Sequence, residues 1–164
     1  MKNTAIKTNA IRLLAQKKAA FEVLSYEPEP GQALSGTEAA VRLGRDPAAV
    51  FKTLVTVGRS GEHYVFMIPA AAELDLKKAA AAAGEKSVAM LKAKDLLPLT
   101  GYVHGGCSPV GMKKQFPTFI DQSAEGLSVI VLSGGRIGVH IELALPELRK
   151  ALPITAAELT AGEA

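Results

Sequence analysis

The fold is decided by Val50-Phe51-Lys52-Thr53-Leu54-Val55-Thr56-Val57, by the turn Gly58-Arg59-Ser60-Gly61 and by the return from Glu62 to Pro69. The first segment is rich in β-branched residues, which favour strands. The glycines and the serine after it are typical of a tight turn. We therefore predict a β-hairpin over residues 50–69.

Lys52 is the unusual residue of this hairpin. Side-chain alternation puts it on the face of Val50 and Leu54, whereas Phe51 and Thr53 lie on the other face. Both faces are largely apolar, so the strand should be covered on both sides. An ammonium group there needs an exit to solvent or an anionic partner. The pattern alone gives equal weight to a functional lysine and to a lysine that snorkels at the strand end.

Segments before the hairpin predict two helices and a strand. The pair Ser35 and Glu38 forms a capping box, and Gly44 is placed to end the helix that it begins. Asp46-Pro47 should open a further short turn. The expected elements are a helix over 9–20, a strand over 21–26, a Pro/Gly loop over 27–31 and a helix over 36–43.

Segments after the hairpin continue the mixture of helices and strands. Asp75 should cap a helix that Gly84 ends, and Pro98 should limit a short helix over 94–97. Strands are expected over 118–121, 128–132 and 137–141, with Gly134-Gly135 as the turn between the last two, and a helix over 146–152 should close the fold. These elements predict one mixed α+β domain over residues 1–164.

Composition narrows the class of protein. Hydrophobic residues make up 48% and charged residues 21%, so the chain should fold. The net charge is +3, and there are no long basic runs. This permits a few phosphate contacts but does not favour an extended basic stripe that binds a nucleic-acid duplex. The single Cys107 excludes an internal disulfide. No signal peptide and no apolar run of roughly 18 residues is present, so we expect a cytoplasmic protein that does not enter membranes.

The segment Gly105-Gly106-Cys107-Ser108-Pro109-Val110-Gly111 could bind a ligand through backbone N–H groups, although most such loops are only tight connections. Cys107 near His104 permits a nucleophile–base pair, but a lone cysteine is more often an apolar filler. The three histidines are far apart in sequence, so no metal site is expected. Ser133-Gly134-Gly135-Arg136 reads either as a hairpin tip or as a binding loop.

Taken together, these segments resemble the YbaK/EbsC family of Cys-tRNA(Pro) deacylases, which are related to the editing domain of bacterial prolyl-tRNA synthetases. The likeness covers about Ala10 to Leu152, and the Phe-Lys-Thr-Leu and Gly-Gly-x-Ser-Pro-x-Gly-x-Lys-Lys blocks are specific only in combination. The matching residues are Tyr26, Gly36-Thr37-Glu38-Ala39-Ala40, Leu43-Gly44, Asp46-Pro47, Val50 to Leu54, Leu74 to Lys78, Thr100 to Val103, Gly105 to Lys114 and Ser133-Gly134-Gly135.

The resemblance implies a YbaK-like fold, with a mixed, mostly antiparallel and barrel-like sheet flanked by helices, and no metal or cofactor. It also implies that Lys52 is essential and that the aminoacylated 3′ adenosine binds beside it. Pocket positions of the family match Tyr26, Thr53, Gly105 and Ser133, and backbone groups around Gly105-Gly106 would orient the substrate. Two departures bear on amino-acid preference: Ser35 stands where an aromatic residue is frequent, and Cys107 stands where isoleucine is frequent.

In this family the thiol of the substrate cysteine is thought to attack its own ester and release tRNA. The expected partners are therefore the 3′ acceptor end of aminoacylated tRNA and prolyl-tRNA synthetase. Three alternatives stay open at this point. They are deacylation of another small amino acid such as alanine or serine, a non-catalytic module that binds tRNA or the synthetase, and a thiol enzyme that depends on Cys107.

Overall fold

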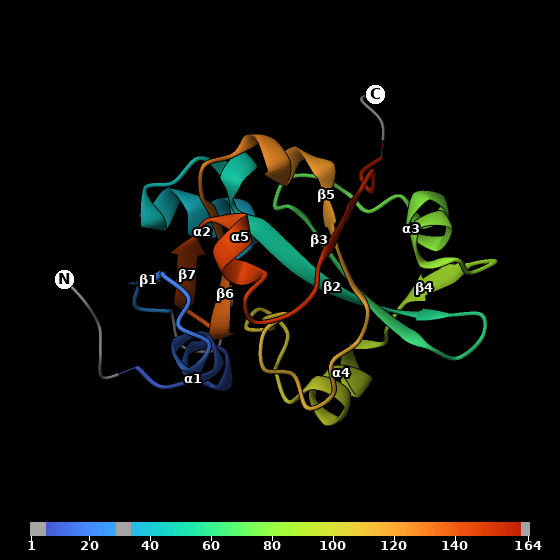
Figure 1. Ribbon diagram of the computed structural model, residues 1–164, viewed down its shortest axis with the longest axis horizontal. Coiled ribbons are helices and arrows are strands. Elements are labelled where there is room, and N and C mark those ends of the chain that lie inside the picture. The colour runs from blue at the N-terminus through green and yellow to red at the C-terminus, as the bar shows by residue number, and fades with distance from the viewer. Residues whose placement is uncertain (1–5, 29–33, 162–164) are drawn as a thin grey trace.

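The computed structural model describes residues 6–28 and 34–161, which form two β-sheets with helices packed around them (Figure 1). One sheet has three strands in the order β1-β7-β6, and the other has five in the order β4-β2-β3-β5-β8. The strands are β1 (Glu22–Ser25), β2 (Phe51–Gly58), β3 (His63–Pro69), β4 (Val88–Met90), β5 (Thr118–Asp121), β6 (Ile130–Arg136), β7 (Val139–Leu143) and β8 (Thr155–Ala157).

The predicted hairpin is the β2–β3 pair at the centre of the larger sheet. Its antiparallel register runs from Phe51 opposite Pro69 to Val57 opposite His63. The strand pairs β1/β7, β6/β7, β2/β3 and β2/β4 are antiparallel, whereas β3/β5 and β5/β8 are parallel. The mixed, mostly antiparallel α+β fold predicted from the sequence is confirmed.

The two sheets meet where β2 begins. Val50 forms an isolated parallel bridge with Val131 of β6. Both valines are buried in a cluster with Ala40 and Ala70. The bridge brings the start of the central hairpin beside the smaller sheet, so residues from both sheets can share one surface.

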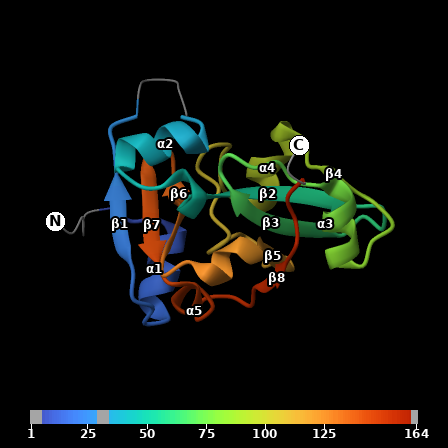
Figure 2. The ribbon, with the colours of Figure 1, turned by 90° about the horizontal axis from the view of Figure 1, so that it is seen from above.

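The helices cover the sheet faces, with α1 and α2 on opposite sides of the smaller sheet (Figure 2). The predicted caps of α2 and α3 are confirmed: Ser35 and Glu38 form the capping box, Asp75 caps α3, and Gly44 and Gly84 end their helices with left-handed φ angles. The helices are α1 (Asn9–Gln16), α2 (Gly36–Leu43), α3 (Leu76–Ala83), α4 (Ala93–Thr100) and α5 (Leu145–Leu148), with short 3₁₀ turns η1 (Pro47–Ala49) and η2 (Gln122–Gly126).

Four predicted bounds are wrong. Helix α1 ends at Gln16 because Lys18 has a φ of 60°, which an α-helix cannot continue. Helix α4 passes through Pro98, an exposed position where water can bind the carbonyl left without an N–H partner, while Leu96 and Leu99 pack against the core. The closing helix α5 has only four residues, and β8 follows it by pairing with β5.

The fourth correction concerns the β6–β7 hairpin. Strand β6 continues through Gly134-Gly135 to Arg136, and the turn is formed by Ile137 and Gly138 instead. The ladder shifts register between Ser133 and Arg136, so the two predicted turn glycines form a bulge. In the predicted loop over 27–31, residues 29–31 lie outside the described residues.

Candidate active site at the open edge of strand β2

A short stretch of β2 lacks a strand neighbour on one side. Strand β3 pairs along one side of β2, and β4 pairs on the other side only with Thr56 to Gly58. The bridge to Val131 occupies that side at Val50. On that side, no strand within residues 6–28 and 34–161 pairs with residues 52–54, which lie between these two contacts. We call residues 52–54 the open edge of β2.

Thr53 presents its backbone groups to this open edge. The carbonyl of Val55 accepts from the Leu91 N–H on the β4 side, whereas the carbonyl of Val50 accepts from Ala70 on the β3 side. Alternation along the strand therefore turns the N–H and C=O of Thr53 away from β3. Its Oγ1 is also buried and has no hydrogen-bond partner among the described residues. The backbone groups of Thr53 therefore lie at the open edge, and its hydroxyl is a buried polar group without a partner in the described chain.

Lys52 and Ser133 lie on adjacent strands and on the same face. Each follows one partner of the Val50–Val131 bridge by two residues, and alternation keeps them on the side of those valines. Lys52 is partly buried, and its ammonium group has no hydrogen bond or ion pair within the described part of the chain. The Ser133 Oγ accepts a bond of 3.1 Å from the N–H of Gly135.

Tyr26 extends this face of the smaller sheet. Its ring lies 5.9 Å from the imidazole of His140, which pairs with Ser133 across the β6–β7 ladder. Tyr26 also contacts Arg42 of α2, whose guanidinium lies 5.7 Å from the centre of the Tyr26 ring. Burial raises the pKa of Tyr26 and lowers the pKa of His140 to about 4, so both side chains are neutral at pH 7.

The predicted glycine loop closes the site from the opposite face. Tyr102 and Cys107 pack with Val55 and Val65, so the loop covers the face of β2 that carries Thr53. A Cβ atom on Gly106 would lie 2.9 Å from the backbone N of Ile137, so the loop also rests against the β6–β7 turn. Gly105 is exposed, with a φ of 86° that favours glycine.

Cys107 is unsuited to nucleophilic chemistry. Its side chain is buried, and desolvation raises the pKa of the thiol to about 12. A nucleophilic cysteine needs a lowered pKa and access to substrate. The geometry therefore favours the apolar-filler interpretation of this residue.

Ser35 lies at the N-terminus of α2, where its Oγ accepts from the Glu38 N–H. The next residue, Gly36, lies so close to Ala70 that an added Cβ would be 2.5 Å from the alanine Cβ. Ala70 in turn donates to the carbonyl of Val50. This packing fixes the start of α2 beside the start of β2, on the side of Lys52.

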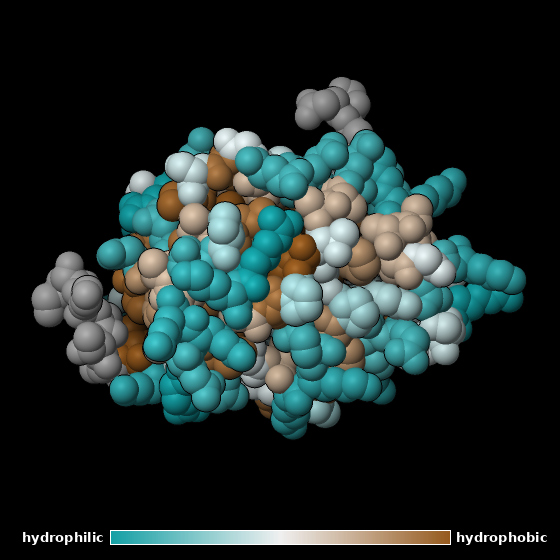
Figure 3. Space-filling view, in the orientation of Figure 1, coloured by the Kyte–Doolittle hydropathy of each residue, from teal (hydrophilic) through white to brown (hydrophobic). Residues whose placement is uncertain are grey.

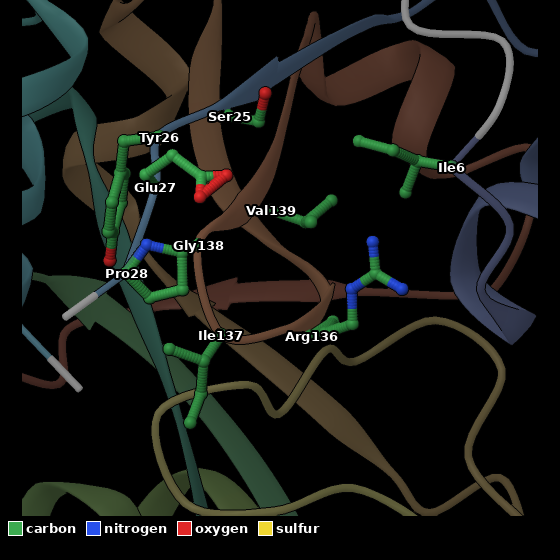
Figure 4. Close-up of a pocket in the computed structure, with 9 residues that line it drawn as sticks. All are labelled: Ile6, Ser25, Tyr26, Glu27, Pro28, Arg136, Ile137, Gly138 and Val139. Carbon is green, nitrogen blue, oxygen red and sulfur yellow. The ribbon is translucent and has the colours of Figure 1, made fainter. Parts of the chain in front are cut away.

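A cavity of about 680 Å³ adjoins this face (Figure 4). Of the predicted site residues, only Tyr26 contributes to its walls. The lining residues are Ile6, Ser25, Tyr26, Glu27, Pro28, Arg136, Ile137, Gly138 and Val139.

Some residues of the site were not found from the sequence. His140 is buried, and its Nδ1 lacks a partner among the described residues. The contact between Arg42 and Tyr26 joins two distant segments. Only the register of β7 between β1 and β6 reveals that Ser133, His140 and Tyr26 share a face, and no local signal gives that register.

The described residues form neither a cluster of metal ligands nor a helix that could span a membrane. No group of three or more His, Cys, Asp or Glu side chains is placed to hold a metal ion there. None of the helices described is both long and apolar enough to cross a bilayer.

Comparison with known proteins identifies the family. Residues 31–151 match the model of the aminoacyl-tRNA editing domain. A candidate Cys-tRNA(Pro)/Cys-tRNA(Cys) deacylase, EbsC, of Enterococcus faecalis is 47% identical over 143 residues, which is 87% of each chain.

Solved structures share the fold. A candidate trans-editing enzyme for prolyl tRNA synthetase gives a TM-score of 0.82 at 25% identity, over 96% of this chain and 99% of its own. A scaffold protein used for grafting epitopes gives a TM-score of 0.82 at 24% identity, over 96% of this chain and all of its own, and shows the fold alone.

The family match and these likenesses define a class of enzyme, the aminoacyl-tRNA deacylases. The chain belongs to the aminoacyl-tRNA editing domain family. The resemblance predicted from the sequence and the predicted YbaK-like fold are confirmed.

Proposed function

We propose that this protein is a cytoplasmic trans-editing deacylase that removes cysteine wrongly attached to tRNA(Pro). The observation that carries the proposal is the partly buried Lys52, which has no partner in the described chain and lies beside Ser133 at an unpaired strand edge. The name of the 47% identical relative supports cysteine as the amino acid. We also propose that residues 1–164 act as one domain.

The proposed substrate is the aminoacylated 3′ end of tRNA. The ammonium of Lys52 neutralises the phosphate of the terminal nucleotide and so holds the ester at the open edge. The free N–H and C=O of Thr53 orient the aminoacyl group, and backbone groups of Gly105-Gly106 bind it from the opposite face. Tyr26, Ser35 and Ser133 form the remaining wall. The proposed reaction needs neither a metal nor a cofactor.

The proposed chemistry uses the thiol of the substrate. The sulfur of the esterified cysteine attacks its own carbonyl carbon, so that a C–S bond forms and the bond from that carbon to the ribose oxygen breaks. The thiol proton passes to the departing oxygen, and the products are a cyclic thiolactone and tRNA with a free hydroxyl. The protein contributes by holding the bent conformer in which sulfur and carbonyl carbon are close. A buried Cys107 thiol is consistent with a protein that supplies no nucleophile.

Single-turnover deacylation of Cys-tRNA(Pro) tests this proposal. Lys52→Ala should lower the rate by at least about 100-fold, because a charge-assisted contact to the substrate phosphate is lost. Cys107→Ser is the matched control and should keep activity within about threefold. Full activity of Lys52→Ala, or a wild-type rate equal to spontaneous hydrolysis, contradicts the proposal. Loss of activity in Cys107→Ser with its fold intact would favour a thiol enzyme instead.

The proposed protein partner is prolyl-tRNA synthetase. The chain has a net charge of only +3, which gives weak intrinsic attraction to the phosphates of a whole tRNA. A structural neighbour is described as a trans-editing enzyme for that synthetase. Association with the synthetase would supply the selection of tRNA that this small surface lacks. The same feature favours, as the second candidate function, a module that binds tRNA or the synthetase without catalysis.

A further inference from the structure

The cavity at the tip of the β6–β7 hairpin lies next to the proposed active site but is separate from its reacting groups. In Figure 4 the side chain of Arg136 points toward Ile6 and Val139, whereas Tyr26 and Ile137 extend to the other side of the hairpin turn. The register agrees, since Ser25 and Arg136 both pair with Val139. The cavity therefore curves around the hairpin tip, from the face of Tyr26 to the face of Arg136.

The cavity carries two opposite charges that are free to bind a ligand. Arg136 and Glu27 are exposed, and neither forms an ion pair within residues 6–28 and 34–161. The ion pairs of the described chain use other residues, such as Arg45 with Glu142. Pro28 and Ile137 add apolar wall on the side of the hairpin turn away from Arg136 (Figure 4). A ligand that suits this lining has an anionic group, a flat apolar surface and a hydrogen-bond donor.

We infer that this cavity receives the nucleotide that precedes the aminoacylated adenosine of tRNA. The inference rests on the proposed function. Tyr26 links the two regions, since it lines the cavity and contacts His140 on the face of Lys52 and Ser133. The Gly105-Gly106 loop also rests directly against Arg136 and Ile137. An RNA strand that ends at the open edge of β2 can therefore continue around the hairpin tip into the cavity.

The chemistry of that nucleotide matches the lining. Transfer RNAs end in CCA, so the preceding nucleotide is a cytidine. Arg136 binds its phosphate, and the carboxylate of Glu27 accepts from the exocyclic amine of cytosine. The base rests on Pro28 and Ile137. The cavity volume of about 680 Å³ falls within the roughly 300–1,000 Å³ of ordinary small-ligand sites.

Binding of an uncharged acceptor-stem minihelix ending in CCA tests the role of Arg136. Arg136→Gln should raise Kd about tenfold, as expected for loss of one charge-assisted hydrogen bond. The slope of log Kd against log salt concentration should decrease by about 0.7, the value for one phosphate of a single strand. The control is Arg59→Gln in the β2–β3 turn, which removes the same charge at the far end of the molecule (Figure 1). Its Kd should stay within twofold of wild type.

A minihelix ending in CUA tests the role of Glu27. Uracil presents an acceptor where cytosine presents a donor, so the wild-type protein should bind CUA about tenfold more weakly. Glu27→Gln should bind both ends equally well, because an amide can donate or accept. Equal binding of CCA and CUA by the wild-type protein contradicts the base contact.

Equal effects of Arg136→Gln and Arg59→Gln, or no binding of the CCA minihelix, overturn the inference. Deacylation assayed in parallel with Lys52→Ala keeps the two ideas apart. Binding that depends on Arg136 without any turnover would refute the proposed function and leave the cavity assignment standing. Turnover that depends on Lys52, with identical binding by Arg136→Gln and wild type, would do the reverse.

Discussion

Lys52 and Thr53 are neighbours in sequence, yet they serve the proposed site in different ways. The side chain of Lys52 lies on the face shared with Ser133, whereas Thr53 acts through backbone groups that lie in the plane of the sheet. A substitution of Thr53 leaves its N–H and C=O in place, so its side chain should matter less than that of Lys52. In the proposed site, the charge of Lys52 holds the phosphate, and the backbone of Thr53 orients the aminoacyl group.

His140 gives the residue-scale prediction, which concerns pH. Burial lowers its pKa to about 4 from an ordinary value of 6.5. Between these values the unfolded chain binds a proton that the folded chain does not. The free energy of unfolding should therefore fall as pH decreases from 6.5 to 4, by roughly 3 kcal/mol in total, and be unaffected by this residue above 6.5.

Urea unfolding of the wild-type protein and of His140→Gln at pH 7.5 and 4.5 measures this contribution. The variant removes the titrating group, so its stability should decline less between the two pH values. Carboxylates such as Glu85, whose pKa is lowered by hydrogen bonds, contribute equally to both proteins and cancel in the comparison. Parallel declines would show that His140 is protonated at little cost in the folded state.

At the scale of elements, the β6–β7 hairpin sets the geometry of the site. Gly138 in its turn has a φ of 86°, and a Cβ there would lie 2.8 Å from the carbonyl oxygen of Tyr26. Gly138→Ala should lower the free energy of unfolding by about 1–3 kcal/mol and displace Tyr26, so that the KM for Cys-tRNA(Pro) rises. Chemical denaturation and deacylation kinetics measure the two effects.

Gly126→Ala is the matched control for this prediction. Gly126 lies in η2, and nothing lies within 4 Å of an added Cβ. Its substitution should change stability by no more than about 0.5 kcal/mol and should leave KM unaltered. A Gly138→Ala protein as stable and as active as this control would show that the hairpin tip adapts freely.

The elements that could be predicted from the sequence are those with local signals. The central hairpin and the caps of α2 and α3 follow from turn residues, a capping box and terminal glycines. The β6–β7 turn could not be predicted, because the bulge at Gly134-Gly135 is held by Thr8, whose hydroxyl donates to the Gly134 carbonyl from the other end of the chain. Strand β8 likewise depends on its pairing with β5.

The candidate site follows the same division. Tyr26, Lys52 and Ser133 were identified by resemblance, and their shared face follows from alternation once the strand register is known. The open edge could not be predicted, because it depends on where β4 stops and where β6 meets β2. The functions of all the predicted site residues stay predictions that substitutions can test, and those of Ser35, Gly105 and Gly106 are included.

At the scale of the whole molecule, the candidate site combines residues from both sheets. Ser133 lies in the smaller sheet, and Tyr26 directly follows its strand β1. Lys52 and Thr53 lie in the larger sheet, and Gly105 lies in a loop outside both. The buried cluster around the Val50–Val131 bridge holds the sheets together. Figure 3 shows hydrophilic residues over most of one face, with apolar residues grouped near its centre and along its left side.

The whole-molecule prediction concerns the choice of substrate. A panel of Cys-, Ser-, Ala- and Pro-tRNA(Pro) should show cysteine removed fastest, with serine at least about 100-fold slower, because a hydroxyl is a far weaker nucleophile than a thiol at neutral pH. Alanine and proline have no attacking group and should be released at the spontaneous rate. Deacylation rates under single-turnover conditions measure the series. Removal of alanine as fast as cysteine would mean that the protein activates water instead.

The open edge of β2 is only three residues long and is closed at both ends, by β4 and by the bridge to Val131. Strands in proteins are most often about five or six residues long. An edge of three residues therefore offers a shorter ladder than a typical added peptide strand would form. Under the proposed function, the short edge suits the single terminal residue of an aminoacylated tRNA better than a length of polypeptide.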